Sequence, residues 1–380
     1  MITVKEVRTR KEQKDFLNFP LTLYADNPCF VPPLYGDEIK MFKKGFVYAD
    51  TCEAVFFNAY ENKKIVGRIQ GIVQRASNDI RNEKRARFTR FDCLDDQKIA
   101  DALFGALENW ARAKGMDTVC GPLGYSDLER EGLLIDGFDE LSTFEEQYNA
   151  PYYAALIEKC GYAKEVDWFE SKIYPPENDD GTIEKMAQFV LKRYDLHIGP
   201  AKNTRDFIRR YADEFFALLD EGYKDLYGTV PFTDAMRKMM ISNFKLIIDV
   251  KHVAVILDKN DRVVCLGLCF PSIARAVQKS KGHLTPAAIF RILYAVKHPK
   301  IIDLGLIAVA PEYMNRGVAS VISAELLKML REDGVEYAET NLNLENNYAI
   351  LNQWKRFKAV RHKVRRAYVK KIEDDGGTAK

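Results

Sequence analysis

The sequence predicts an α/β protein, an α+β fold with a mixed sheet, made of two similar domains in tandem. Three observations predict it. The chain has 380 residues, a length that suggests about two domains, and 47% of them are hydrophobic. Strand and helix patterns also recur in the same order in each half. A chain this rich in apolar residues can bury two cores, so extensive disorder is not expected.

Each half contains a predicted β-hairpin. Residues 54–73 read AVFFNAYENKKIVGRIQGIV, and residues 253–270 read VAVILDKNDRVVCLGLCF. Each stretch is an apolar strand, a short polar turn and a second apolar strand. Cys265 and Cys269 face the same side of the second hairpin, and we expect them to be core thiols.

An amphipathic helix, a glycine turn and a strand follow later in each half. The first helix ends at Gly115 and the second at Gly334, and the predicted strands are 116–121 and 335–341. The same order in both halves is explained by a duplication of one unit. A chance similarity between two α/β domains is the alternative.

The spacing of the two copies differs by one insertion. The hairpin turns are 198 residues apart (Asn62 to Asn260), whereas the helix-ending glycines are 219 residues apart. The second copy therefore holds 21 more residues between its hairpin and its helix. The helical stretch within 272–300 is the expected place for this insertion.

The stretch 174–182, YPPENDDGT, predicts a boundary between domains. Its two prolines and three acidic residues cannot continue a strand. We expect the chain to divide into a first domain over 1–176, a linker and helix over 177–195, a second domain over 196–372 and a disordered tail over 373–380.

Residues 306–327, LIAVAPEYMNRGVASVISAELL, are the most informative segment. An apolar strand ends at Pro311, a polar turn with Gly317 follows, and a helical pattern then begins. This order predicts a loop whose backbone N–H groups, with the helix N-terminus, hold an anionic phosphate group. Gly317 has no Cβ, so a pyrophosphate could approach its backbone closely. A glycine required only by the turn is the alternative.

This segment resembles the acyl-CoA pyrophosphate loop of the GNAT superfamily of N-acyltransferases, which reads Gln/Arg-x-x-Gly-x-Gly/Ala between a strand and a helix. Gly317 and Ala319 match it, Met314 departs from it, and Arg316 lies nearby with a positive charge. Residues 158–162, EKCGY, resemble a late GNAT segment in the first half. The resemblance implies two tandem GNAT-like domains.

The matching helix N-terminus in the first half carries Asp95 and Asp96. These carboxylates would repel a pyrophosphate by roughly 1 kcal/mol or more for each close charge pair. We therefore expect a degenerate first domain and a second domain that binds acetyl-CoA or another acyl-CoA. The first domain would complete the substrate cleft or stabilise the sheet arrangement.

The resemblance implies an N-acetyltransferase that transfers groups other than aminoacyl groups to an amine of a small molecule or peptide. It places the pantetheine arm of the cofactor along the strand 307–309, bound like an added strand. The cofactor-binding residues that it implies are Ile307, Ala308, Val309, Asn315, Arg316, Gly317, Val318, Ala319, Ser320, Asn347 and Trp354.

Attack of an amine on a thioester needs a base for the ammonium group and donors for the oxyanion. Asp303 and Glu339 are the base candidates, because a carboxylate inside an apolar strand tends to have a raised pKa. A solvent-facing charge is the alternative for each. Tyr223 and Tyr227 lie where the resemblance places a substrate-covering loop, and Tyr227 is a catalytic candidate. Ordinary aromatic packing is the alternative for both.

GNAT enzymes often use a tyrosine to protonate the leaving thiolate, and Trp354 occupies that place here. Either the thiolate leaves without help, another residue donates the proton, or the protein is not an enzyme. A catalytically silent acyl-CoA-binding or scaffold protein is therefore one alternative, favoured by Met314 and Trp354. A Fem-type aminoacyl-tRNA-dependent transferase is another, although the sequence shows no long helical-hairpin arm.

The net charge of +2 does not mark a nucleic-acid-binding or membrane-binding protein, and the apolar runs are far short of about 18 residues. The seven cysteines are scattered, without metal or disulfide spacing. We expect a reduced, cytoplasmic protein with no metal and no membrane as partner, while nucleic acid is a minor alternative for the basic end and a homodimer stays open.

Two charged segments allow two interpretations each. The basic end, 355–371, is interpreted as a solvated edge strand protected by lysines and arginines. Attraction of CoA phosphates or of an acidic substrate is its alternative. The segment 121–147 is rich in Gly, Asp and Glu, and its acids either attract a cationic amine or are simply solvated.

Overall fold

The computed structural model describes residues 1–372, and the predicted tail 373–380 lies outside the described residues. The first half contains β1 (Ile2–Glu6), α1 (Arg10–Leu23), α2 (Tyr35–Glu38), β2 (Cys52–Glu61), β3 (Lys64–Gln74), α3 (Arg75–Arg81), β4 (Arg85–Cys93), α4 (Gln97–Ala113), β5 (Thr118–Gly121), β6 (Leu133–Asp136), α5 (Tyr153–Lys159) and β7 (Ala163–Tyr174).

The second half contains α6 (Thr182–Arg193), β8 (His197–Ile198), α7 (Thr204–Tyr223), α8 (Asp234–Phe244), β9 (Val253–Leu257), β10 (Val263–Pro271), α9 (Ala274–Lys279), α10 (Pro286–Lys297), β11 (Ile301–Val309), α11 (Ala319–Leu330), β12 (Tyr337–Thr340), β13 (Asn343–Leu344), α12 (Tyr348–Trp354) and β14 (Lys358–Lys371). The helical insertion expected within 272–300 is present as α9 and α10.

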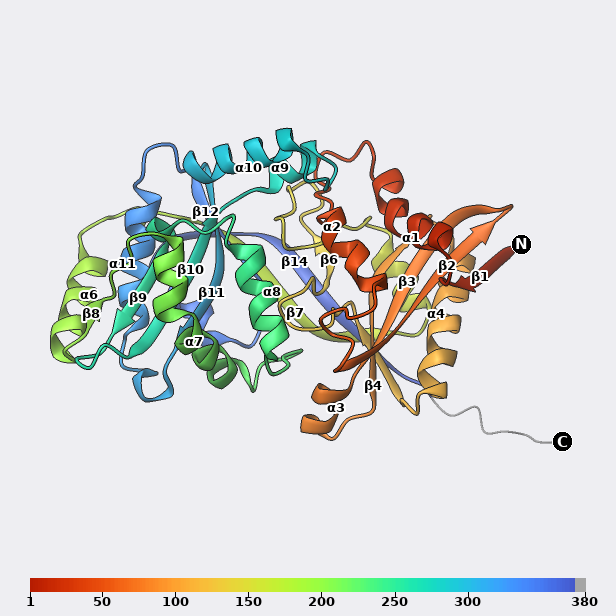
Figure 1. The fold of residues 1–380 in the computed structure, drawn as a ribbon, viewed down its shortest axis with the longest axis horizontal. Coiled ribbons are helices and arrows are strands. Elements are labelled where there is room, and N and C mark those ends of the chain that lie inside the picture. The colour runs from red at the N-terminus through yellow and green to blue at the C-terminus, as the bar shows by residue number, and fades with distance from the viewer. Residues whose placement is uncertain (373–380) are drawn as a thin grey trace.

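One continuous mixed sheet runs through the described part of the molecule (Figure 1). Its strand order is β1-β2-β3-β4-β5-β14-β7-β12-β11-β10-β9-β8, while β13 pairs with β7 and β6 pairs with β14 off this path. Helices α4 and α11 pack on the first-half and second-half strands, where Leu103 and Leu327 are fully buried. The mixed α/β class predicted from the sequence is confirmed.

The repeated blocks form where the sequence predicts them. The hairpins β2–β3 and β9–β10 are antiparallel, and Asn62 and Asp261 take positive φ angles of 48° and 61° in their turns. Gly115 and Gly334 follow α4 and α11 with φ of 74° and 91°, in the left-handed region that favours glycine. These are local features, and local spacing was sufficient to find them.

The last strand of each half lies against strands of the other half. β14 pairs antiparallel with β5 on one side and with β7 on the other. β7 in turn pairs with β12 and β13 of the second half. The terminal strands are therefore exchanged, and the pairing crosses the division into 1–176 and 196–372, which stays a prediction.

β14 lies inside the sheet, so the interpretation of 355–371 as a solvated edge strand is wrong. Lys363 and Arg365 are fully buried, with Lys363 Nζ 2.8 Å from Glu170 Oε2 and Arg365 Nε 2.5 Å from Glu170 Oε1. Burial alone would raise the pKa of Glu170, but Arg365 and Lys363 lower it to about 2. The strand's positive charges therefore meet a carboxylate on β7 instead of water.

We predict that Lys363→Met strongly destabilises the protein. It leaves the carboxylates of Glu170 and Glu339 buried with less compensating charge, which should lower the free energy of unfolding by about 3–5 kcal/mol in urea denaturation. The matched control is Lys358→Met at the exposed end of the same strand, where we expect a loss below about 1 kcal/mol. Equal losses in both variants would contradict a special role for the buried pair.

Candidate functional site

The candidate site begins where two parallel strands part. β11 and β12 pair only through residues 301–304 and 337–340. Beyond Thr340 the chain turns to β7 through β13, whereas β11 continues beside β10. The β10–β11 register shifts so that Gly305 has no direct partner, which is a β-bulge. The edge of β11 over 305–309 therefore faces a gap where β12 would otherwise lie.

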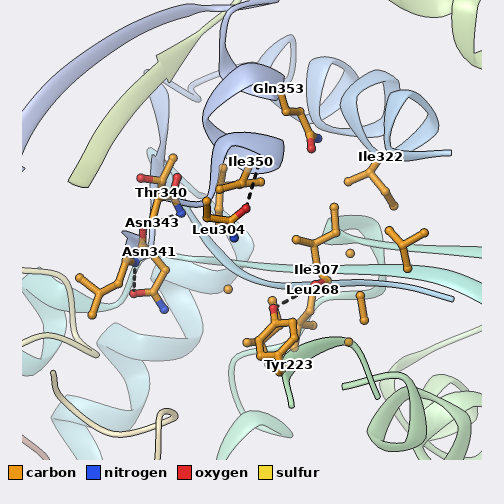
Figure 2. A pocket seen from close by; sticks show the side chains of 18 of the residues that line it. Tyr223, Leu268, Leu304, Ile307, Ile322, Thr340, Asn341, Asn343, Ile350 and Gln353 are labelled. Carbon is orange, nitrogen blue, oxygen red and sulfur yellow. Dashed lines mark hydrogen bonds between the residues drawn. The ribbon is translucent and has the colours of Figure 1, made fainter. Parts of the chain in front are cut away.

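A cavity of about 670 Å³ occupies this gap (Figure 2). Leu268, Leu304, Ile307 and Ile322 form part of its apolar wall, and they come from β10, β11 and α11. This volume and this apolar lining are typical of sites for small molecules and cofactors. The cavity is therefore the candidate site.

Most of the residues predicted for binding line this cavity. They are Ile307, Ala308, Val309, Asn315, Gly317, Val318, Ala319, Asn347 and Trp354, and the catalytic candidate Tyr227 joins them. Arg316, Ser320, Asp303 and Glu339 are not among the lining residues. Arg316 is the residue that could supply the positive charge that Met314 lacks. Its guanidinium lies 5.7 Å from the ring centres of Tyr194 and Tyr313.

The loop 311–318, which we call the phosphate loop, borders the cavity. Asn315 and Gly317 have positive φ angles of 61° and 78°. α11 then begins at Ala319, and no side chain caps its N-terminus. The N–H groups of Ser320 and Val321 already donate to the carbonyl oxygens of Gly317 and Val318, at 2.8 and 3.0 Å, so what remains to attract an anion is the positive end of the helix dipole. The positive φ of Gly317 is what the turn requires, and its role in holding a phosphate group stays a prediction.

The corresponding helix of the first half is capped. The Oδ1 atom of Asp96 accepts a hydrogen bond from the backbone N–H of Lys98 at 2.9 Å. A carboxylate already occupies this positive end of the helix dipole, so it opposes a second anion. That only the second half accepts a pyrophosphate stays a prediction, and this cap supports it.

Two tyrosines reach the cavity from the end of α7 and the loop after it. The Tyr223 hydroxyl donates to the carbonyl oxygen of Ile307 at 2.9 Å, as Figure 2 shows, and the Tyr227 hydroxyl donates to Glu165 Oε2 at 2.5 Å. Burial raises the pKa of Tyr223 to about 12 and raises the pKa of Tyr227 well above its ordinary value. Both side chains are therefore phenols that keep their proton at neutral pH.

Asn347 and Trp354, two of the residues predicted to bind the cofactor, each form a hydrogen bond within the protein. Asn347 caps α12, because its side-chain oxygen accepts from the backbone N–H of Ile350 at 3.4 Å. The indole N–H of Trp354 donates to Asn343 Oδ1 at 2.6 Å. Both residues line the cavity, but these bonds give each a role in holding its shape.

The base candidates Asp303 and Glu339 lie opposite each other in the β11–β12 pairing. Glu339 Oε1 is 2.5 Å from Lys363 Nζ and 3.2 Å from His362 Nε2. Burial opposes the charge of Glu339, but Lys363 and His362 lower its pKa, so the expectation of a raised pKa is wrong there. The sequence could not show that a lysine 24 residues away supplies the counter-charge.

Asp303 does have the raised pKa that the sequence analysis expected. The side chain is buried, and a hydrogen bond with the Ser272 side chain only partly offsets the effect of that burial. Burial first, and then the charge of Glu339, raise the pKa of Asp303 well above its ordinary value. Asp303 thus lies behind the cavity wall, in surroundings that disfavour its charged form.

The first half supplies five carboxylates to the cavity, which we call the acidic wall: Asp127, Glu129, Glu131, Glu145 and Glu146. Glu131 is 4% exposed, and its Oε1 has no hydrogen-bond partner among the described residues. Glu145 Oε2 accepts from Asn341 Nδ2 at 3.3 Å, which joins the wall to the second half. The composition of 121–147 was the only sequence signal for these residues.

Burial is the main cause that raises the pKa of every member of the acidic wall. The pKa rises to about 7 for Glu145 and to about 8 for Glu146. The alternative that these acids are simply solvated does not fit Glu131 and Glu146, which are buried. A cation that entered the cavity would lower these pKa values and gain charged partners.

Some other features bear on the kind of site. Within residues 1–372, no helix combines the length and the apolar character needed to cross a membrane. The same residues contain no group of three His, Cys, Asp or Glu side chains arranged to hold a metal ion. The seven cysteines are free thiols, and Cys265 and Cys269 are buried in the core as expected.

We predict that Asp303→Asn makes stability less dependent on pH. The pKa of Asp303 is higher in the folded state than in the unfolded state. The contribution of Asp303 to the free energy of unfolding is therefore greatest below about pH 3.9 and falls as the pH rises toward the folded-state pKa. The amide of the variant cannot ionise. As the pH is raised from 5 to 8, the denaturation midpoint of the variant should therefore rise relative to that of wild type. The exposed control Asp95→Asn should follow wild type, and identical profiles for all three proteins would contradict the assignment.

Two curated proteins match almost the whole chain. Protein YghO of Escherichia coli K12 is 27% identical over 395 aligned residues, covering 97% of this chain and 95% of that protein. A bacterial ceramide synthase of Caulobacter vibrioides is 26% identical over 382 aligned residues, covering 98% of each chain. No protein-family model matches the chain. These relatives share its full length at modest identity.

Among solved structures, the chain is similar to a tandem GNAT protein from the clavulanic acid biosynthesis pathway. The TM-score is 0.55, with 12% identity over 98% of this chain and 100% of that one. At such identity the likeness concerns the fold. The parted parallel strands, the phosphate loop and the duplicated order of elements agree with it. This chain therefore has the tandem fold of the GNAT N-acyltransferases, as the resemblance of its loop predicted.

Proposed function

We propose that the protein is an acyl-CoA-dependent N-acyltransferase. Its second half would bind the acyl-CoA, and the acidic wall of its first half would receive the amine. One observation carries the proposal: a single cavity that is bordered by the N-terminus of α11, which no side chain caps, and lined by the acidic wall, in which Glu131 and Glu146 are buried. An anionic donor and a cationic acceptor would thus meet between the two halves.

The residues on the donor side fit an acyl-CoA. The positive end of the α11 dipole suits a pyrophosphate, and the open edge of β11 over 305–309 suits a pantetheine arm bound like an added strand. Since Met314 carries no charge, the backbone and the helix dipole would supply the binding. Gly317, with Val318 and Ala319 at the helix start, would form the pyrophosphate site.

The apolar lining supports donors longer than acetyl-CoA as well as acetyl-CoA itself. Beyond β11, the cavity is lined by the aromatic side chains of Trp168, Phe244 and Phe270. Together they offer more apolar surface than an acetyl group can cover. A ceramide is the amide of a fatty acid and a long-chain amino alcohol. The name of the Caulobacter relative is therefore consistent with amide formation by a protein of this kind.

The reaction forms a bond between the amine nitrogen and the thioester carbonyl carbon and breaks the C–S bond. The ammonium group must first lose a proton, for which we assign Glu131, a buried carboxylate with an unpartnered oxygen. Tyr227, a phenol in the cavity wall, is the candidate that protonates the departing thiolate, for which its hydroxyl must turn from Glu165. The nitrogen gives its second proton to the Tyr227 oxygen after attack, so the phenol is restored and only the proton taken by Glu131 is released.

In this proposal, Asp303 and Glu339 do not act as the base, because neither lines the cavity and Glu339 is held by Lys363. A catalytically silent acyl-CoA-binding protein is the second candidate function. Trp354 favours it, since its indole cannot protonate a thiolate and already bonds to Asn343. Thiol release in an amine panel distinguishes the two.

We predict that Gly317→Glu weakens acyl-CoA binding at least about tenfold, because a carboxylate near the pyrophosphate costs roughly 1–4 kcal/mol. Calorimetric titration with acetyl-CoA and with a long-chain acyl-CoA measures it. Gly115→Glu is the matched control, since Gly115 has a similar positive φ of 74° and open space around it but lies in the first half. Absence of binding to wild type would remove the basis of the proposal.

We predict that Glu131→Gln lowers kcat for amine acylation about 10²-fold or more, the usual contribution of a general base. A base acts when deprotonated, so the wild-type rate should rise as the pH passes its pKa, and the variant should lack this rise. Acyl-CoA binding by calorimetry should stay unchanged. The exposed control Glu83→Gln should behave as wild type, while a Glu131→Gln variant with an unaltered pH profile would exclude this base.

A further inference from the structure

The insertion of the second half carries a surface that the proposed function does not use. Between Ser272 and Lys300 the sequence contains six Lys and Arg residues and no Asp or Glu. The segment folds as α9 and α10, and α10 lies along the outer edge of the molecule in Figure 1. A chain with a net charge of only +2 thus concentrates positive charge in one segment.

α10 is apolar on the side that faces the solvent as well as on the side that faces the protein. Ala288 and Ile292 are buried against the core, whereas large apolar side chains on the opposite stripe of the helix are exposed. The exposed fractions are 38% for Ile289, 70% for Phe290, 42% for Leu293 and 58% for Tyr294. Leu284, just before the helix, is 48% exposed.

The cations border this apolar stripe. Arg275, Lys279, Lys281, Lys297 and Lys300 are exposed, and Lys300 is 3.5 Å from Glu336 in a surface pair. His283 packs on the ring of Tyr35, and His298 stacks on Tyr294. The surface formed by 272–300 therefore combines exposed apolar side chains with a nearly unpaired set of positive charges.

We propose that the surface formed by 272–300 docks onto an anionic lipid bilayer, with the stripe of α10 inserted at the interface. A helix with exposed Phe, Leu and Ile and flanking Lys and Arg is what lies flat in the headgroup region. Anionic lipids supply the negative charge that this segment lacks. The docking is peripheral and requires no membrane-spanning helix.

Charge favours a lipid surface over a second copy of the chain. In a two-fold dimer the same surface faces itself, so the cations of one copy would approach those of the other. Nucleic acid would satisfy the cations but would leave Phe290 and Leu293 without apolar partners. A bilayer with anionic headgroups satisfies both parts of the surface.

The docking surface is fixed to the wall of the cavity. Ile292 of α10 packs in one apolar cluster with Phe270, which also lines the cavity. A docked α10 would hold the cavity beside the lipid surface, where amphiphilic amines and long-chain acyl donors reside. This inference goes beyond the proposed function and does not require it, because lipid binding is measured without any reaction.

The test is co-sedimentation of the full-length protein with vesicles. Wild type should bind vesicles that contain phosphatidylglycerol, bind pure phosphatidylcholine vesicles less, and lose affinity as salt is raised. Phe290→Glu should lower the bound fraction about tenfold, since one buried Phe side chain contributes roughly 1.5–3 kcal/mol. Ile80→Glu on α3 is the matched control, because Ile80 is also an exposed apolar residue, at 64%, and should bind as wild type.

Three outcomes would overturn the inference. Wild type that fails to sediment with anionic vesicles excludes the lipid surface. Equal binding by wild type and Phe290→Glu places the contact elsewhere. A wild-type dimer in gel filtration that Phe290→Glu converts to a monomer, without vesicle binding, assigns the surface to a second copy. Circular dichroism of both variants excludes misfolding as the cause of a loss.

Discussion

The pairing of β7 with β14 is the constraint on which the rest of the structure depends. Glu170 of β7 lies between Lys363 and Arg365 of β14, and Lys363 also reaches Glu339 on β12. Charges removed from water are tolerated only when their partners are in place. A slip of one residue would turn both cations to the other face of the sheet, so this cluster fixes the register of the exchanged strands.

The exchange makes the cavity a joint product of both halves. β7 pairs with β12 and β13, so Trp168 of a first-half strand becomes part of the cavity lining. The divergence of β12 from β11 after Thr340 follows from the same pairing, because the chain must reach β7. The segment 127–146 then closes the cavity, joined to it by the bond from Asn341 to Glu145.

The cavity combines two opposite electrostatic environments, and our proposal that it joins an anionic donor to a cationic acceptor rests on them. The helix end at Ala319 offers positive partial charge without any basic side chain. The acidic wall offers carboxyl groups whose pKa values are raised by burial, and a nearby cation would lower them. The exposed apolar face of α10 belongs to a helix whose Ile292 packs in one cluster with Phe270 of the cavity wall, which links the proposed lipid-docking surface to the cavity.

The sequence by itself determined the features that depend on neighbouring residues. Alternating apolar residues set the hairpins, a glycine turn followed α4, and the order strand, Gly317, helix set the loop 311–318. Tertiary structure alone decided the partners of buried charges: Glu170 lies 193 residues from Lys363, and no local pattern links them. For the same reason the sequence misplaced β14 at an edge, expected a raised pKa for Glu339, and could not select Glu131 from an acidic loop.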